Sequence, residues 1–301
     1  MRSLYEFKSF NTRIVFFSSL ASAMGLLTLF LFMAWVVQDY VKKEALITLE
    51  EMTASHASSV AIEIDSALEQ TETLRLSIEG LQQYGITERK AYRAILERFM
   101  KDNPQYLGAF AAWEPNALDG NDAFLAGTED TNAQGRAMFY YYYDENQKLS
   151  YEAFNDFDES DADYYTIPRE SKKIELIEPY AEPTDGVTRY MASTVAPLLD
   201  RSGNFVGVTG IDITLSKLQE FINTLRPFDV GIAGLVSANG VWVAHPDGQL
   251  LMQPVSETVK SMIAQAHTDG KSIRQEKVGK DDMYLITMPI KFMETDTEWT
   301  F

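Results

Sequence analysis

The sequence predicts an α+β protein with one transmembrane helix and a long stalk helix that carries two α/β modules with antiparallel sheets. Three observations lead to this prediction. An uncharged apolar run near the N-terminus is long enough to cross a bilayer. Apolar residues then recur at helical spacing, with no proline between Gln38 and Asn103. The remainder contains two series of short apolar runs bounded by turn residues, each with a helical pattern, which is typical of strands packed with helices.

The predicted transmembrane helix covers residues 14–37. This run has 24 residues without a charge, and at about 1.5 Å per residue it exceeds the roughly 30 Å hydrocarbon core of a bilayer. Core helices seldom stay apolar on all faces over this length, and cleaved signal peptides have shorter apolar regions. Arg2, Lys8 and Arg13 precede the run, so the positive-inside rule places residues 1–13 in the cytoplasm. We expect an anchor in the inner membrane and a periplasmic remainder.

Residues 38–80 form the predicted stalk helix. Apolar residues recur along it at helical spacing, at Leu46, Leu49, Met52, Val60, Ile64, Leu68, Leu74 and Ile78. The other faces are polar or charged, so this stripe is expected to pack against a partner helix or a domain. The length of the stripe leads us to expect a homodimer formed through the stalk. Gly80 and Gly85 end the helix, and a second helix is predicted after Thr87 and Glu88.

Residues 81–225 form the first predicted module, and residues 226–301 form a second one that is incomplete at its C-terminus. Four apolar runs predict strands in the first module: YLGAFAAW, RAMFYYYY, YMASTVAPLL and NFVGVTGIDITL. A helix is expected at Ser216–Leu225, and another around Ser256–Ala266. The pair Asn239–Gly240 predicts a hairpin in the second module. Short connections between the runs favour antiparallel pairing.

Composition excludes several classes of function. The formal net charge is −18, so the polyanionic backbone of nucleic acid would be repelled. The absence of cysteine removes disulfides, thiolate metal sites and cysteine nucleophiles. We find no phosphate-binding glycine loop, no zinc-protease motif and no nucleophile elbow. We therefore expect no catalytic site, no metal site and no cofactor.

Five segments follow the membrane helix in a characteristic order: AAWEPNALDGND (111–122), GRAMFYYYY (135–143), DADYYTIPRESKKIELIEPY (161–180), MASTVAPLLDRSGNFVGVTGIDITL (191–215) and AGLVSANGVWVAHPDG (233–248). Together they resemble the double Cache sensor domains of bacterial chemoreceptors, histidine kinases and diguanylate cyclases, over nearly the whole chain. The resemblance implies two PAS-like modules, of which the membrane-distal one binds a small molecule. It also implies a second membrane helix after Phe301 and a cytoplasmic signalling region. We expect a methyl-accepting chemotaxis protein, with a histidine kinase or diguanylate cyclase as the alternative.

Asp212 is the strongest candidate for a ligand-binding residue. It interrupts the apolar strand VTGIDITL, where an unpaired charge would be costly. Its partner is either a structural group, such as an arginine or backbone N–H groups, or the ammonium of a ligand. The resemblance implies the second, because the matching aspartate of amino-acid-sensing relatives binds the ligand's amino group. Tyr180, in the matching segment IEPY, would lie beside it.

Tyrosines are concentrated between positions 140 and 180, and a tyrosine offers a pocket both an apolar ring and a hydroxyl group. The alternative for each tyrosine is ordinary packing in the core. Alternate residues of a strand face opposite sides of the sheet, so the tyrosines at 140–143 cannot all face one cavity. The ligand-binding residues that we predict are Trp113, Tyr140, Tyr142, Asp163, Tyr165, Tyr180 and Asp212. The expected ligand is an amine, an amino acid or a related polar solute.

The sequence departs from the family at the position of the carboxylate clamp. Amino-acid sensors of this family have an Arg-x-Trp-Tyr segment, and the matching residues here are Ala162, Asp163, Tyr164 and Tyr165. An alanine beside an added aspartate disfavours an α-carboxylate, so a cationic or neutral ligand becomes the stronger expectation. Arg136 or Arg169 could supply an anion contact from elsewhere in the fold.

Other interpretations remain open at this stage. The acidic stretch at 155–163 has alternating ligand-type residues but lacks the glycine and the final glutamate of a calcium loop, so a solvated acidic loop is expected. The chain could also be an anchored enzyme or an adhesin-like surface protein. A further alternative is a sensor of a ligand-loaded periplasmic binding protein.

Overall fold

The computed structural model describes residues 10–128, 131–153, 162–184, 187–278, 281–293 and 295–301. Backbone contacts divide the chain into two compact units, Met1–Met52 and Thr53–Phe301. The first helix, α1 (Phe10–Gln83), contributes residues to both. Among the described residues, α1 is the one helix that is long and apolar enough to cross a membrane, and its most apolar window is not buried in the protein.

Five more α-helices follow α1 in the described residues: α2 (Arg89–Asp102), α3 (Asp122–Leu125), α4 (Asp163–Ser171), α5 (Leu215–Thr224) and α6 (Glu257–Asp269). Two 3-10 turns lie at Pro227–Asp229 and Gly248–Leu250. The strands of the larger sheet are β1 (Gly108–Trp113), β2 (Met138–Tyr143), β3 (Leu149–Ala153), β4 (Glu175–Thr184), β5 (Val187–Leu199) and β6 (Phe205–Thr214). The remaining strands are β7 (Leu235–Val236), β8 (Trp242–Ala244), β9 (Ser272–Val278), β10 (Asp281–Thr287), β11 (Pro289–Lys291) and β12 (Glu298–Thr300).

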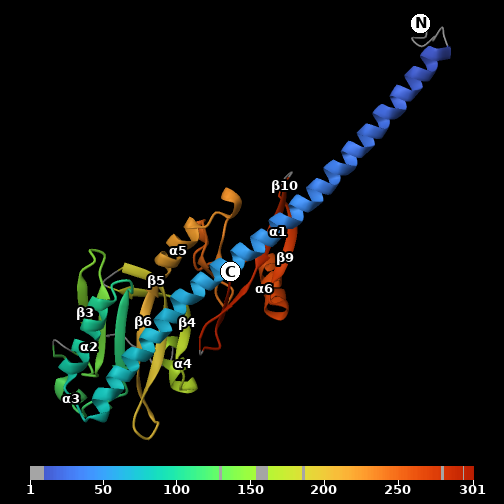
Figure 1. The fold of residues 1–301 in the computed structure, drawn as a ribbon. Coiled ribbons are helices and arrows are strands. Elements are labelled where there is room, and N and C mark those ends of the chain that lie inside the picture. Colours follow the sequence, from blue (N-terminus) through green and yellow to red (C-terminus); the bar gives the residue numbers. More distant parts are fainter. Residues whose placement is uncertain (1–9, 129–130, 154–161, 185–186, 279–280, 294) are drawn as a thin grey trace. The chain divides into compact units, whose positions relative to one another are not determined.

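The first six strands form one sheet in the order β3-β2-β1-β6-β5-β4, with every neighbouring pair antiparallel (Figure 1). The four apolar runs of the sequence correspond to β1, β2, β5 and β6, so the predicted antiparallel α+β fold is confirmed. Strands β3 and β4 were not predicted, because charged residues and prolines interrupt their apolar pattern. They lie at the two edges of the sheet, where such residues are tolerated.

One face of this sheet packs against α1 and α2. The stalk residues Val60, Ile64, Leu68, Leu74 and Ile78 are all buried in a core that also contains Tyr92, Leu96 and Met100 of α2 and the inward side chains of the sheet. This corrects the sequence-based argument for a dimer, because this part of the apolar stripe is covered by the chain's own sheet. The stripe therefore needs no partner helix at these positions.

A second sheet has the order β11-β12-β7-β8, and β9 pairs with β10 in a separate hairpin. The hairpin predicted at Asn239–Gly240 joins β7 to β8, and Gly240 adopts φ 73°, a left-handed conformation that suits glycine. Trp299 of β12 is fully buried in the centre of this region. The boundary between two modules at residue 225 stays a prediction, because the compact units divide after Met52 instead.

Candidate functional site

The face of the larger sheet that is turned away from α1 carries the residues with the clearest chemistry. One row of directly paired residues crosses five strands, through Tyr142, Gly108, Asp212, Ser193 and Ile177. Paired residues of antiparallel strands point to the same face, so their side chains are neighbours. Asp212 occupies the centre of this row.

Asp212 is buried, with 3% of its surface exposed. Ser193 donates a hydrogen bond from Oγ to Asp212 Oδ1 at 2.6 Å, and the Tyr180 hydroxyl lies 2.8 Å from Ser193 Oγ. Because Ser193 uses its proton on the carboxylate, Tyr180 is the donor to Ser193. The chain Tyr180–Ser193–Asp212 therefore supplies the carboxylate with hydroxyl groups.

The electrostatics of Asp212 are unusual for a carboxylate. Burial raises its pKa to about 6, the hydroxyl groups of Ser193 and Tyr140 oppose that rise, and the charge of Glu182 adds to it. No described basic residue forms an ion pair with Asp212. Hydroxyl groups compensate a buried negative charge only in part, so the site favours a bound cation.

Tyr140 lies close to Asp212 because a glycine makes room for it. A Cβ atom at Gly108 would lie 2.4 Å from the Tyr140 ring, so no larger residue fits at that position without displacing the ring. Tyr140 and Tyr142 stack with centroids 5.1 Å apart. Burial, followed by the charge of Asp212, raises the pKa of the Tyr140 hydroxyl well above its ordinary value, so that hydroxyl remains protonated near Asp212.

Helix α4 covers this face of the sheet. Its residue Tyr164 stacks with Tyr180 at 6.1 Å and meets Phe110 edge-on at 5.7 Å. Tyr165, the next residue, is fully buried in the same cluster. The carboxylate of Asp212 is thus placed among aromatic rings, an environment that suits a desolvated organic cation.

Further negative charge adjoins the site from the edge strands. Glu152 of β3 pairs with Tyr140, and Glu182 of β4 lies near the tyrosines. Burial raises the pKa of Glu182, and the neighbouring Glu152 adds to the rise. A cation is therefore attracted by more than one carboxylate.

The predicted site residues are brought together only in part. Tyr140, Tyr142, Tyr180 and Asp212 share the face described above, and Tyr165 lies in its apolar cluster. Trp113 belongs instead to the opposite face, where it packs against Tyr92 and Phe139. Its position in β1, an odd number of residues from Gly108, dictates this orientation.

Asp163 also lies apart from the other predicted residues. It is the first residue of α4, with an exposed side chain. The two arginines considered as anion contacts are engaged elsewhere: Arg136 donates to the Trp113 carbonyl and the Tyr165 hydroxyl, and Arg169 pairs with Glu114 at 3.5 Å.

The sequence reasoning did not identify Gly108, Glu152, Glu182 and Ser193. A glycine inside a strand marks the close approach of another group, which was the available indication for Gly108. Glu152, Glu182 and Ser193 join the site only through the order of the strands in the sheet, which the sequence does not reveal. The acidic stretch at 155–163 falls largely outside the described residues, and no group of acidic or histidine side chains in the described part could hold a metal ion.

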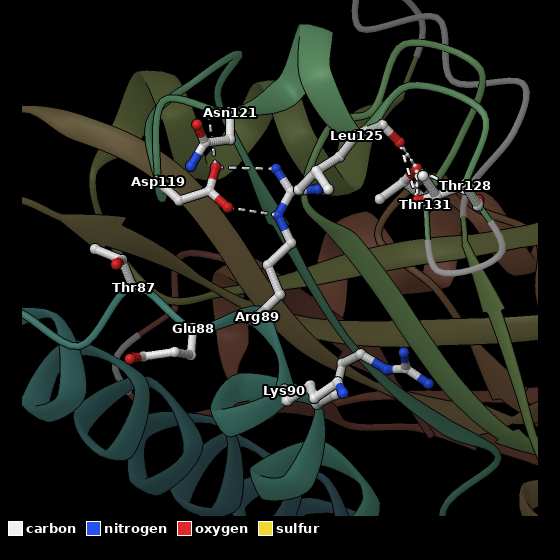
Figure 2. A pocket seen from close by; sticks show the side chains of 10 residues that line it. Thr87, Glu88, Arg89, Lys90, Asp119, Asn121, Leu125, Thr128 and Thr131 are labelled. Carbon is white, nitrogen blue, oxygen red and sulfur yellow. Dashed lines mark hydrogen bonds and ion pairs between the residues drawn. The ribbon is translucent and has the colours of Figure 1, made fainter.

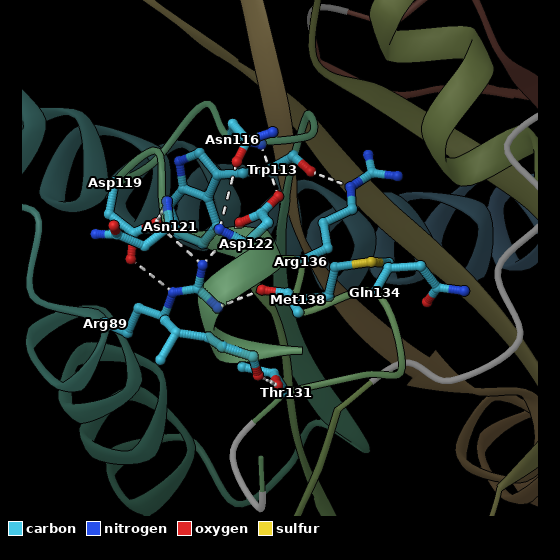
Figure 3. A network of polar contacts seen from close by, with 12 residues as sticks. Arg89, Trp113, Asn116, Asp119, Asn121, Asp122, Thr131, Gln134, Arg136 and Met138 are labelled. Carbon is cyan, nitrogen blue, oxygen red and sulfur yellow. Dashed lines mark hydrogen bonds and ion pairs between the residues drawn. The ribbon is translucent and has the colours of Figure 1, made fainter. Parts of the chain in front are cut away.

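A cavity of about 360 Å³ lies elsewhere, between the start of α2 and the loop around α3 (Figure 2). Arg89 lies in its wall, and each of its three side-chain nitrogen atoms donates a hydrogen bond: the guanidinium binds both oxygens of Asp119, Asp122 Oδ1 at 2.7 Å and the Gly135 carbonyl at 2.6 Å (Figure 3). Hydrogen bonds from Arg89 lower the pKa of Asp119. This network joins α2 to the loop and has a structural role.

Known proteins resemble the region that contains this sheet. Residues 92–220 match the family model for the first PDC sensor domain of methyl-accepting chemotaxis protein-like proteins. The chemotaxis protein TlpQ of Pseudomonas aeruginosa is 29% identical over 158 residues, which are 48% of this chain and 22% of TlpQ. The chain thus spans about a fifth of the length of that relative.

Solved structures share the fold of this chain. Methyl-accepting chemotaxis protein X aligns over 88% of this chain and 97% of its own, with a TM-score of 0.75 and 24% identity. The extracellular domain of mmHK1S-Z3, described as a histidine kinase, covers 85% of this chain and 93% of its own, with a TM-score of 0.72 and 25% identity. More distant neighbours, at 16% identity and a TM-score of 0.57, are ligand-binding domains with bound asparagine or GABA.

The region from α2 to α5 is a sensor domain of the methyl-accepting chemotaxis protein type, in a chain with the double Cache fold and an N-terminal apolar helix. The curated relatives TlpQ and PctB of Pseudomonas aeruginosa are methyl-accepting chemotaxis proteins.

Proposed function

We propose that this chain is the sensing part of a chemoreceptor that binds a small organic cation at Asp212. Residues 14–37 would cross the inner membrane, and the unit from Thr53 onward would lie in the periplasm. The ligand would occupy the predicted distal module, on the face of the sheet that α4 covers. The observation that carries the proposal is the buried Asp212 carboxylate, surrounded by hydroxyl groups and aromatic rings and lacking an ion-pair partner among the described residues.

A physical route connects this site to α1. Ser193 faces Asp212, and the next residue of β5, Thr194, faces the opposite side of the sheet. There the Thr194 hydroxyl lies 2.6 Å from the Thr71 hydroxyl of α1. A ligand that draws Ser193 toward a new position would therefore also act on α1, provided that it binds one arrangement of β5 more tightly than another.

The test of ligand binding uses the full chain in detergent micelles. Melting temperatures are measured with a panel of amines, amino acids, nucleobases and organic acids, for the parent and for Asp212→Asn. A cationic member of the panel should raise the melting temperature of the parent and leave that of Asp212→Asn unchanged. Asp269→Asn, which changes an exposed aspartate on α6, serves as the matched control and should respond like the parent.

Two results would count against the proposal. The first is a set of well-folded proteins in which no compound raises the melting temperature, which would favour recognition of a periplasmic binding protein. The second is an equal response from the parent and Asp212→Asn, which would place the ligand elsewhere. A homodimer also remains part of the proposal, and light scattering of the detergent-solubilised chain measures it.

The signalling output has a second candidate. The similarity to mmHK1S-Z3 extends over most of this chain, so the same sensor could control a histidine kinase. Sequencing or mass analysis of the region after Phe301 in the intact protein distinguishes a chemotaxis coiled coil from a kinase core.

A further inference from the structure

A positively charged side chain lies on the same face of the sheet as Asp212. Arg189 belongs to β5, four residues before Ser193, so the two side chains point to the same side of the sheet. The residue paired with Arg189 on β4 is Glu182. The site therefore contains a guanidinium group as well as carboxylates.

The Arg189 side chain extends across the sheet toward Asp212. Its guanidinium carbon lies 5.5 Å from the centre of the Tyr142 ring, although strands β6 and β1 separate β5 from β2. With about 4.8 Å between neighbouring strands, the two backbones are roughly 14 Å apart. The side chains of Arg189 and Tyr142 must therefore extend over the intervening strands, one of which carries Asp212.

The guanidinium group is not fully used by the protein. Nη1 of Arg189 is buried and has no hydrogen-bond partner among the described residues. No described carboxylate forms an ion pair with Arg189, and the raised pKa of Glu182, caused first by burial and then by Glu152, agrees with an unneutralised carboxylate. A buried charged donor that lacks an acceptor is costly and calls for an explanation.

We propose that Arg189 binds an anionic group of the same ligand whose cationic nitrogen binds Asp212. The inference rests on the proposed function and deepens it, because it makes the ligand a small zwitterion instead of a simple amine. Guanidinium groups bind carboxylates through two parallel hydrogen bonds, which gives both affinity and orientation. Arg189 would thus supply, from β5, the anion contact that Ala162 does not provide.

The spacing of the two charges limits the size of the ligand. Arg189 is four residues from Ser193, which is roughly 13 Å along a strand, and Ser193 is paired directly with Asp212. The long arginine side chain crosses much of this distance on its way to Tyr142. A ligand that contacts both groups would therefore be an ammonium and an anion joined by a short carbon chain.

The test compares amino acids with the amines that lack only their carboxylate. The pairs are L-lysine with cadaverine, L-arginine with agmatine, L-leucine with 3-methylbutylamine, and 4-aminobutyrate with propylamine. Calorimetric titration of the full chain in detergent gives each Kd. At least one acid should bind ten times more tightly than its own amine, because only the acid can pair with Arg189.

Variants assign the preference to Arg189. Arg189→Gln should weaken the binding of the acid by about tenfold to a hundredfold, the range expected when a charge-assisted hydrogen bond is lost, and should change the amine less than threefold. Arg189→Lys keeps the charge and should retain part of the preference. Arg98→Gln alters an exposed arginine on α2 and should behave like the parent.

Each contrary result has a distinct meaning. If the amines bind as tightly as the acids and Asp212→Asn abolishes both, the role given to Arg189 is wrong and the proposed function stands. If Arg189→Gln weakens acid and amine equally, Arg189 supports the structure of the site and does not contact the ligand. If no member of the panel binds the folded parent, this inference and the cationic-ligand proposal both fail.

Discussion

Two buried polar clusters in this protein use their charges in opposite ways. In the first, Arg89 meets Asp119, Asp122 and a backbone carbonyl, and its hydrogen bonds lower the pKa of Asp119. In the second, burial raises the pKa of Asp212 to about 6, and among the described residues the carboxylate receives hydrogen bonds from hydroxyl groups and forms no ion pair. A cluster that satisfies itself stabilises a fold, whereas one left incomplete can bind something from outside. The contrast separates a structural cluster from the binding site that we propose.

The largest effect is expected in the self-satisfied cluster. Arg89→Ala should lower the free energy of unfolding by about 3–5 kcal/mol, because it leaves two carboxylates nearly buried without their partner. Urea unfolding of the full chain in detergent, followed by near-ultraviolet circular dichroism, measures this loss. Arg98→Ala breaks an exposed pair and should change stability by less than about 0.5 kcal/mol. Similar losses in both variants would remove the distinction between the clusters.

The incomplete cluster should respond in the opposite direction. Asp212→Asn should raise the stability of the ligand-free chain at pH 7.5 by up to about 3 kcal/mol, the equivalent of a pKa moved from 3.8 to about 6. The folded protein holds the proton more tightly than the unfolded chain does, so the stability of the parent falls as pH rises from about 4 to about 6 and is then constant. The difference between parent and variant, measured across this range, isolates Asp212. A destabilised variant at pH 7.5 would contradict this interpretation.

A third polar contact joins the larger, six-stranded sheet to the second sheet. Glu178 lies in the bulge of β4 between Ile177 and Tyr180, and its oxygens accept hydrogen bonds from Trp299 Nε1 at 3.1 Å and from the Asn239 backbone at 2.9 Å. Because Glu178 has hydrogen-bond donors within the protein, this contact resembles the structural cluster around Arg89. Glu178→Ala should cost about 1–3 kcal/mol and speed amide exchange at Asn239. Unchanged exchange there would show that the contact does not hold the two regions together.

The smallest expected effect is on ligand affinity at low pH. A cation binds the deprotonated form of Asp212, whose pKa without ligand is about 6. Affinity for the cationic compound found in the melting screen should therefore fall about tenfold for each pH unit below 6, and should be constant from pH 7 to 8. Calorimetric titrations from pH 5 to 8 measure this dependence. An affinity independent of pH would mean that Asp212 is not the group that binds the cation.

Much of the fold was predictable from the sequence because local patterns carried it. The long apolar run, the helical spacing up to Ile78 and the four apolar strand runs depend only on neighbouring residues and their periodicity. Asp212 was predictable as well, since a charge inside an apolar strand needs a partner wherever the strand lies. Alternation along a strand likewise placed Tyr140 and Tyr142 on one face.

Only the tertiary structure decided which strands are neighbours, and with them the composition of the site. Glu152, Glu182 and Arg189 come from edge or neighbouring strands, and nothing near them in the sequence links them to Asp212. The same holds for the stalk between Val60 and Ile78, where the apolar stripe could have faced another chain and instead covers its own sheet. Periodicity states that a face is buried, but the group that buries it is set by contacts between residues far apart in the chain.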